Sequence, residues 1–413
     1  MISLTRISRF FRHAGRQIWF RAAVISATSV VIAALAGIVA RAIPYEFTGD
    51  VGQSAVGKIL EIIASSMLAV TTFSMTAMVS AYSSATQLAT PRATQLMISD
   101  RTSQNALSTF LGSFIFAVVG IIGLQTHLYG GQGRVVLLLA TIILIVLVEV
   151  TLLRWIAHLA AFGWMADVID RVENAACAAM SAFARNPYDG ARPAISVPAS
   201  AMAICSIDIG YVTHIDAEAL ALLAQKHDLA IHVEVLTGTL VHPNRPLLRI
   251  VGDASSDPVC KALANAFTAE RHRRFDHDPR LGVIALGEIA GRALAPATND
   301  PGTAIEVVNA LFRVLSLLPA DAPPSDADRP PVYMARPSAD ELVRGGFVPI
   351  IREGAGEEEV VIRTRKVLDA LGKALPHGAE TTQSLSDELR RNVERNIKDD
   401  RALLRALEIQ FRF

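Results

Sequence analysis

The sequence is poor in cysteine, in aromatic residues and in charge. Its 413 residues include three cysteines, and 19% of residues are charged against 51% that are hydrophobic. Cys177, Cys205 and Cys260 lie too far apart to form a disulfide framework or a cysteine zinc motif. Lysine and arginine together number 39, as do aspartate and glutamate. This balance argues against a basic nucleic-acid-binding protein and against an acidic, solvating chain.

Recognisable catalytic motifs are also missing. The sequence has no Walker loop, no dinucleotide fingerprint, no nucleophile elbow and no HExxH, and its paired glycines Gly345 and Gly346 are typical of an isolated turn. Residues 271–278 mix histidine with aspartate, but their spacing matches no zinc motif and favours a solvated charged turn. We therefore predict no enzyme activity, no metal and no cofactor.

Charged residues leave four long gaps in the first 153 residues. Residues 22–40, 62–91 and 102–133 contain no Asp, Glu, Lys or Arg, and residues 135–153 contain only Glu149. A bilayer core of ~30 Å requires about 20 apolar helical residues. Lipid offers no partner to backbone amides, so such segments must be helical. We predict a transmembrane domain at 22–153 whose four helices lie at 22–40, 62–82, 106–124 and 135–153.

Basic residues set the expected orientation. Five arginines precede the first predicted span, and the loops on the opposite side carry few basic residues after acidic ones are offset. The positive-inside rule then places both termini in the cytoplasm. Residues 1–21 form a basic amphipathic segment. It either rests as a helix on anionic lipid or serves as a basic tail that orients the chain.

The second predicted span carries a stripe of hydroxyl groups. Its charge-free run would extend about 45 Å as a helix, and helical spacing places one set of side chains on a single face: Ser65, Thr72, Thr76 and Ser80. This hydroxyl stripe either lines a water-filled path or packs closely against another helix.

Glu149 is the carboxylate inside a predicted span, which makes it a functional candidate. It lies four residues from the predicted cytoplasmic end. Snorkelling to the interface or pairing with a cytoplasmic arginine is the alternative explanation.

The remaining sequence predicts an amphipathic stalk helix at 154–185 and a cytoplasmic mixed α/β domain at 186–413. Alternating apolar residues predict strands, and spacings of three and four predict helices. The expected strands are 203–208, 229–236 and 247–251. The expected helices are 217–226, 257–272, 282–294, 304–318 and 385–407, and a strand and a helix are expected within 357–375.

Residues 295–303 form the most distinctive stretch of the chain. It includes Pro296, Asn299, Asp300, Pro301 and Thr303 between two apolar helices, and the spacing of Thr303 and Glu306 places the start of the second helix at Thr303. One interpretation is a helix–turn–helix corner, because Asn and Asp favour tight turns. The other is that free amides at the helix start bind an anion, an idea that the neighbouring Asp300 weakens.

Together these features resemble a bacterial family of predicted membrane proteins, domain of unknown function 2254. The resemblance covers nearly the whole chain. It is carried by Ala89-Thr90-Pro91-Arg92 with Asp100-Arg101, by Leu111-Gly112-Ser113-Phe114, by Gly210-Tyr211-Val212 with Ile215-Asp216, and by Arg292-Ala293-Leu294-Ala295-Pro296 leading into Asn299-Asp300-Pro301 and Thr303-Ala304. The chain departs at Ala295, where serine is expected, and at Thr237-Gly238-Thr239, where a Pro-Gly-Asp turn is expected. The resemblance implies a multi-pass protein of the bacterial inner membrane with a C-terminal cytoplasmic domain and no assigned catalytic residues.

Two functions fit these observations. The first is a homo-oligomeric channel or transport-type protein with a cytoplasmic regulatory domain, because one four-helix subunit is too small to enclose a pore. In that case the hydroxyl stripe faces the symmetry axis, and the partners are the lipid bilayer and further copies of the chain. The second is a membrane-anchored sensor or scaffold whose cytoplasmic domain binds a partner or a small ligand near Asn299 and Asp300.

Overall fold

The computed structural model describes most of the chain from residue 53 onward. The described residues are 23–24, 27–28, 30–31, 53–88, 90–98, 100–126, 129, 131–161, 164–252, 257–318, 329–375 and 378–398. They divide into two compact units. We call Met1–Gln87 with Thr94–Asp167 the apolar unit, and Leu88–Ala93 with Val168–Phe413 the α/β unit.

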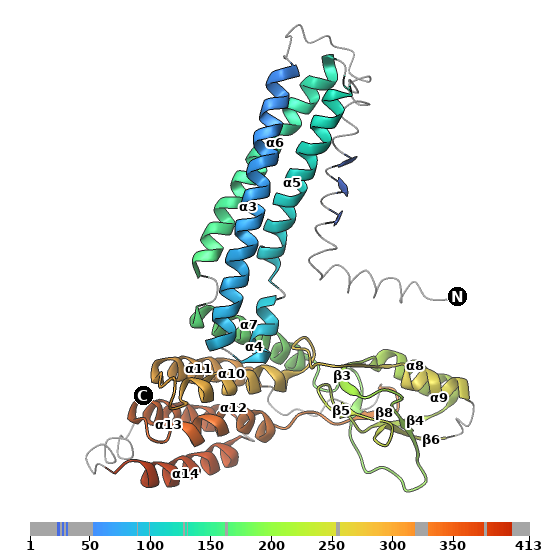
Figure 1. The fold of residues 1–413 in the computed structure, drawn as a ribbon. Helices are drawn as coiled ribbons and strands as arrows, with labels where there is room; N and C mark the ends of the chain where they lie inside the picture. Colours follow the sequence, from blue (N-terminus) through green and yellow to red (C-terminus); the bar gives the residue numbers. More distant parts are fainter. Residues whose placement is uncertain are drawn as a thin grey trace. The chain divides into compact units, whose positions relative to one another are not determined.

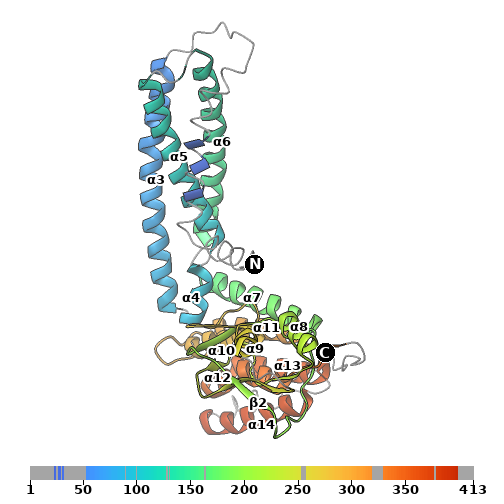
Figure 2. The ribbon, with the colours of Figure 1, turned by 90° about the vertical axis from the view of Figure 1, so that its right-hand side faces the viewer.

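Three long helices make up most of the described part of the apolar unit, and they lie side by side in Figures 1 and 2. They are α3 (Gln53–Leu88), α5 (Arg101–Gln125) and α6 (Gly131–Ala161), with the short helix α4 (Pro91–Ile98) between α3 and α5. Asp100 begins α5 as its N-cap, because its carboxylate accepts a hydrogen bond from the Ser103 amide at 2.7 Å. The three helices share one apolar core, which includes Leu60, Met67, Phe110, Phe116, Leu137 and Trp155.

Each of these helices contains a segment long and apolar enough to cross a membrane. The segments are Ser54–Ser83, Thr102–Gln125 and Gly133–Ala160. They coincide with the second, third and fourth predicted spans. The first predicted span, 22–40, lies almost entirely outside the described residues, so the count of four transmembrane helices stays a prediction. The predicted N-terminal segment 1–21 also lies outside them.

The α/β unit begins, after its short contribution from α4, with helix α7 (Met165–Arg185). The predicted stalk at 154–185 is therefore divided between two helices, since α6 ends at Ala161. Within this unit, Arg92 of α4 donates a hydrogen bond to Glu288 of α10 (Pro279–Ala293) and forms an ion pair with it.

Two sheets follow α7. The larger sheet has the order β1-β8-β4-β6-β2, and the smaller has the order β5-β3-β7. Their strands are β1 (Arg192–Pro193), β2 (Met202–Cys205), β3 (Gly210–Ile215), β4 (Ala230–Val233), β5 (Leu240–Val241), β6 (Pro246–Val251), β7 (Phe267–Glu270) and β8 (Val332–Met334). Helices α8 (Ala217–His227) and α9 (Asp257–Ala264) contact the larger sheet, over a buried row that includes Ile231 and Leu248.

Helices form the rest of the unit. They are α10, α11 (Pro301–Leu315), α12 (Ala339–Glu353), α13 (Glu358–Ala374) and α14 (Ala379–Asn396). Gly345 and Gly346 lie inside α12, so the predicted isolated turn is wrong. A Cβ atom at Gly287 of α10 would lie 2.6 Å from the carbonyl oxygen of Gly346. Backbone therefore packs directly on backbone where α10 crosses α12, and Gly287 requires the smallest residue.

Two further sequence predictions of secondary structure are wrong. The helix expected at 257–272 ends at Ala264, and Phe267–Glu270 is strand β7, whose Phe267 is buried opposite Ile215 of β3. The segment 357–375 holds one helix, α13, with no strand among its described residues. The expected helix at 385–407 corresponds to α14, which begins earlier at Ala379, and residues 399–413 lie outside the described part.

Candidate functional site

A cleft in the α/β unit collects polar side chains from segments far apart in the sequence. Its volume is about 140 Å³, which holds on the order of ten water-sized positions. It is lined by Ala179, Ala182, Phe183, Asn186, Pro187, Asp189, His214, Ile215, Leu236, Thr237, Asp276, His277, Pro279, Met334, Ala335 and Pro337. A cleft of this volume is smaller than most ligand pockets and suits a molecule of about six non-hydrogen atoms, the size of benzene.

Turns and strand ends position this lining. Helix α7 ends at Arg185, and the turn that follows brings Asn186 and Asp189 to the cleft. His214 comes from β3 and His277 from the loop between β7 and α10, and their ring centroids are 5.0 Å apart. The cleft thus has two neighbouring imidazoles in its lining, together with apolar side chains that include Phe183 and Met334.

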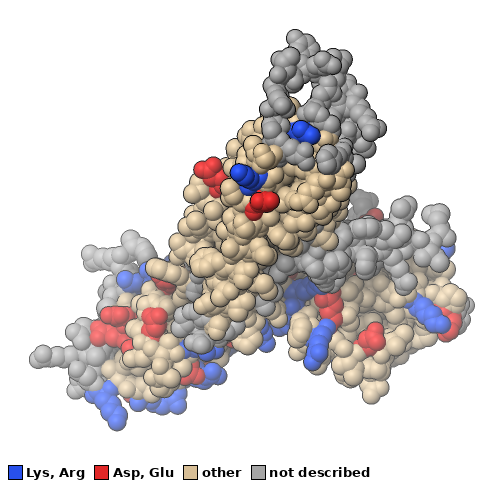
Figure 3. Space-filling model, turned by 45° about the horizontal axis from the view of Figure 1, so that its top comes forward, with Lys and Arg blue, Asp and Glu red and all other residues tan. Residues whose placement is uncertain are grey.

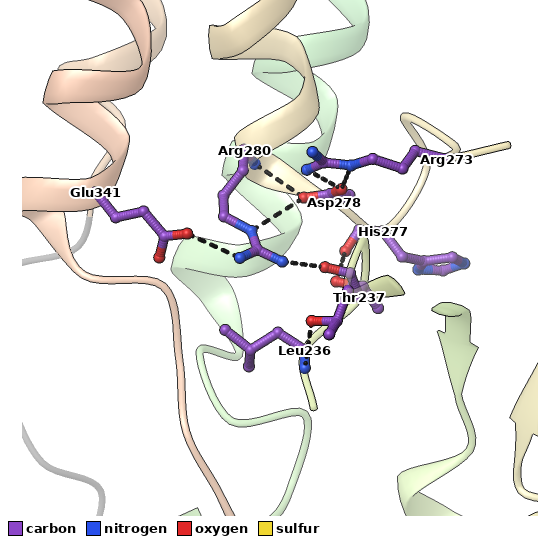
Figure 4. A network of polar contacts seen from close by, with 8 residues as sticks. Leu236, Thr237, Arg273, His277, Asp278, Arg280 and Glu341 are labelled. Atoms are coloured by element: carbon purple, nitrogen blue, oxygen red, sulfur yellow. Dashed lines mark hydrogen bonds and ion pairs between the residues drawn. The ribbon is translucent and has the colours of Figure 1, made fainter. Parts of the chain in front are cut away.

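A buried carboxylate fixes the loops beside the cleft, as Figure 4 shows. Asp278 is 2% exposed, and its Oδ2 accepts hydrogen bonds from Arg273 Nε at 2.8 Å and Nη2 at 2.5 Å. Its Oδ1 accepts from the Arg280 amide at 3.2 Å, so Asp278 is also the N-cap of α10. Buried charges need partners of this kind, because desolvation otherwise costs several kcal/mol per ion.

Arg280 extends this network to two further segments. Its Nη2 donates to the carbonyl oxygen of Thr237, and its Nη1 donates to Glu341 Oε1 of α12 at 2.8 Å. The Thr237 hydroxyl in turn donates to the carbonyl oxygen of His277 at 2.7 Å. One guanidinium therefore ties the β4–β5 loop, the start of α10 and the start of α12 together.

Gly238 allows this close packing. Its φ is +82°, and a Cβ there would overlap the Asp278 carboxylate and lie 2.8 Å from Arg273 Nε. The turn Thr237-Gly238-Thr239, where the sequence departs from the expected Pro-Gly-Asp, thus lies against the buried ion pair. The interpretation of residues 271–278 as a solvated turn is wrong for Phe275 and Asp278, which are both buried.

The hydroxyl stripe lies on the exposed side of α3. Ser65, Thr72, Thr76 and Ser80 are all exposed, whereas Leu60, Met67 and Met78 face the core. The hydroxyls of Thr72 and Thr76 donate to carbonyl oxygens four residues earlier, at 2.9 and 3.0 Å. The stripe is therefore not buried among the three described helices, and that face is open to another helix or another subunit.

Glu149 is also exposed, on α6. The helix continues past the predicted end at Leu153, and the apolar segment extends to Ala160, eleven residues beyond Glu149. Figure 3 shows the broad uncharged surface of the apolar unit and the few charged side chains toward one of its ends.

The 295–303 stretch forms a helix corner. Asp300, rather than Thr303, is the N-cap of α11: its carboxylate accepts from the Thr303 amide at 3.1 Å and from the Thr303 hydroxyl at 2.6 Å. These hydrogen bonds from Thr303 hold the pKa of Asp300 below its ordinary value. Pro301 has no amide hydrogen, so the carboxylate occupies the helix start and leaves little for an external anion.

The other residues of this corner have structural positions. Pro296 and Asn299 are exposed, and Asn299 has a φ of +46°. None of the five predicted residues lines the cleft, so the cleft is not the ligand site expected near Asn299 and Asp300. No group of three or more His, Cys, Asp or Glu among the described residues is arranged to hold a metal ion.

Sequence reasoning missed Asp278, yet a signal was present. Asp278-Pro279 and Asp300-Pro301 both place a capping carboxylate directly before a proline at the first helical position, and both precede an apolar helix. The long-range partners of Arg280, Thr237 and Glu341, had no such local signal, because they are 43 and 61 residues away from it in sequence.

Comparison with known proteins identifies the family. The family described as "Predicted membrane protein (DUF2254)" matches residues 15–370 of this chain. The chain belongs to this family. The resemblance found in the sequence is thereby confirmed, and the family together with the apolar helices supports a membrane location.

Individual relatives match a shorter region. Uncharacterized proteins of Mycobacterium bovis (Mb1321c) and Mycobacterium tuberculosis (MT1328 and Rv1290c) are each 35% identical over 106 residues, which is 24% of this chain. The alignment spans 20% of the length of those relatives. No solved structure matches the chain.

Replacing Gly238 by alanine tests the packing beside Asp278. We expect Gly238→Ala to destabilise the protein by about 1–3 kcal/mol more than Gly190→Ala, because overpacking adds to the cost of a positive φ. Gly190 has a nearly equal φ of +84°, and no atom lies within 4 Å of a Cβ built there. Gly190→Ala therefore measures the cost of the positive φ alone. Thermal unfolding of the full chain in detergent measures the difference. Equal losses of stability in the two variants would show that the Arg273–Asp278 ion pair can move aside without a measurable loss of free energy.

The depressed pKa of Asp300 makes a prediction about pH. The ionised carboxylate stabilises the fold above its ordinary pKa of 3.8, and this contribution is lost as pH falls through the lower folded-state pKa. We expect the melting temperature of the wild type to fall more steeply than that of Asp300→Asn as pH drops below about 4. Asp257→Asn, at an exposed residue, is the control. Parallel profiles for wild type and Asp300→Asn would contradict the prediction.

Proposed function

We propose that this protein is a membrane-anchored sensor or binding protein whose α/β unit takes up a small polar molecule in the cleft. The observation that carries the proposal is the convergence of His214, Thr237 and His277 on one hollow whose wall is fixed by the buried Asp278 network. Binding sites are concave and mostly apolar, with a few polar groups that orient the ligand. The cleft has this composition.

The lining suggests what kind of molecule would fit. Imidazoles and the Asn186 amide can donate or accept hydrogen bonds, and the carboxylates of Asp189 and Asp276 accept them. Ile215, Leu236 and Met334 offer an apolar floor. We infer a small metabolite of about six non-hydrogen atoms that carries hydrogen-bonding groups.

The location follows from the arginine distribution. We propose that the apolar unit crosses the bacterial inner membrane several times and that both termini and the α/β unit lie in the cytoplasm, because basic residues gather on that side. The cleft would then sample cytoplasmic metabolites, and the spans would anchor the sensor to the membrane.

Filling the cleft tests this proposal. Ala182 lines the cleft near the end of α7, whereas Ala178 is exposed on the same helix and does not. We expect small polar metabolites to raise the melting temperature of the full chain in detergent. At a ligand concentration a hundredfold above Kd, the free energy of unfolding should rise by about 2.7 kcal/mol. Ala182→Phe should abolish the shift and Ala178→Phe should keep it. A shift that survives Ala182→Phe, or a screen in which no compound of this size stabilises the wild type, would refute the proposal.

A second candidate is the homo-oligomeric channel or transport-type protein. The exposed hydroxyl stripe on α3 favours it, because Ser65, Thr72, Thr76 and Ser80 remain available to a neighbouring subunit. The three described helices pack around an apolar core, so a pore would require several copies. Solute flux across vesicles that is unchanged when Thr72 and Thr76 are both replaced by valine would exclude a pore lined by this stripe.

A further inference from the structure

The loop between β2 and β3 exposes two large apolar side chains. Ile207 is 80% exposed and Ile209 is 75% exposed. Leu240 of β5, the neighbour of Tyr211 in the sheet, is exposed as well. Leaving an isoleucine in water rather than burying it costs about 1.5–3 kcal/mol. We call Ile207 and Ile209 the isoleucine tip.

The loop that carries the tip is ordered by its own hydrogen bonds. The Ser206 hydroxyl donates to the carbonyl oxygen of Asp208 at 2.7 Å and accepts from the Asp208 amide at 3.2 Å. Strand β2 pairs with β6 on one side of the loop, and β3 pairs with both β5 and β7 on the other. The loop that carries the two isoleucines therefore has each of its ends in a different sheet.

The strand registers place basic residues next to one side of this tip. Tyr211 pairs with Glu270 and Gly210 pairs with Val241, so continuing both registers brings Arg271 and His272 of one neighbouring chain segment, and His242 of the other, beside Ile209. All three are exposed. Arg245 is held nearby, because its Nη1 donates to the carbonyl oxygen of Leu240 at 3.1 Å.

Acidic groups near the tip are fewer. Asp208 lies between the two isoleucines and is exposed. Glu270 is paired with Arg274, whose Nε donates to it at 2.7 Å. Apolar side chains at the tip of a structure with basic residues at its base are the arrangement that binds an anionic lipid surface: the apolar groups enter the headgroup boundary and the cations approach phosphate.

We propose that the isoleucine tip inserts into the headgroup region of an anionic bilayer, with Arg245 and Arg271 contacting lipid phosphates. Lipid is favoured over a protein partner by the charge complementarity, and by membership of a membrane protein family, which keeps a bilayer permanently within reach of the chain. A single myristoyl-type anchor binds only marginally. Two isoleucines would likewise bind the bilayer only weakly and reversibly, in addition to the anchoring by the spans.

Quenching of an added tryptophan by brominated lipid tests the proposal. The full chain carrying Ile207→Trp is reconstituted into vesicles of phosphatidylglycerol and phosphatidylcholine, and the signal of the parent chain, which has three tryptophans, is subtracted. The control is Leu222→Trp, at a residue 62% exposed on α8. We expect quenching of the tryptophan at 207 to be several-fold stronger than at 222. Adding Arg245→Glu and Arg271→Glu, or raising the salt concentration, should weaken it.

Two results would overturn the proposal. One is equal quenching at 207 and 222. The other is a tryptophan at 207 whose emission is blue-shifted but insensitive to brominated lipid, which would indicate that protein rather than lipid covers the tip. Both variants replace exposed side chains, so loss of folding would not hide either outcome.

Discussion

The geometry of the α/β unit depends on the burial of one carboxylate. Asp278 is almost fully enclosed, caps α10 and neutralises Arg273. Arg280, two residues later, then carries the constraint to the Thr237 loop and to Glu341 on α12. Removing the carboxylate would leave guanidinium groups without their buried counter-charge, a change that typically costs several kcal/mol. The loops that line the cleft are held in one arrangement by the ion pairs and hydrogen bonds of Asp278 and Arg280.

Close helix packing supports this arrangement from the other side. Where α10 crosses α12, Gly287 lies against the backbone of Gly346, and where α10 passes α7, Gly282 lies against Ala176. Both crossings involve α10, the helix that Asp278 begins. Small residues let backbones approach closely, so little can slide or rotate there without a clash. A rigid α10 in turn fixes the loop from Asp276 to Pro279 that lines the cleft.

The sequence predicted those parts of the protein whose signal is local. Gaps in charge located the apolar segments of α3, α5 and α6, and alternation located β2, β4 and β6. It failed where tertiary pairing decides: 267–270 has helix-forming neighbours, yet Phe267 is buried opposite Ile215. It also failed where a polar residue is buried by distant partners, as for Asp278. The start of α11 was misplaced by three residues, because the Thr303–Glu306 spacing was preferred to the Asp300-Pro301 cap.

The length of α3 has a consequence for how deeply the helices sit in lipid. Its apolar segment has 30 residues, or about 45 Å, against a hydrocarbon thickness of ~30 Å. Residues 62–83 alone match that thickness, so the turns carrying Lys58 and Glu61 stand clear of it. A Cβ atom at Gly120 of α5 would lie 3.0 Å from Leu60 and 3.6 Å from Leu137, so the three helices pack together at this level. An upright α3 with residues 62–83 in the hydrocarbon would extend beyond that layer, and a thicker membrane would cover more of its projecting end.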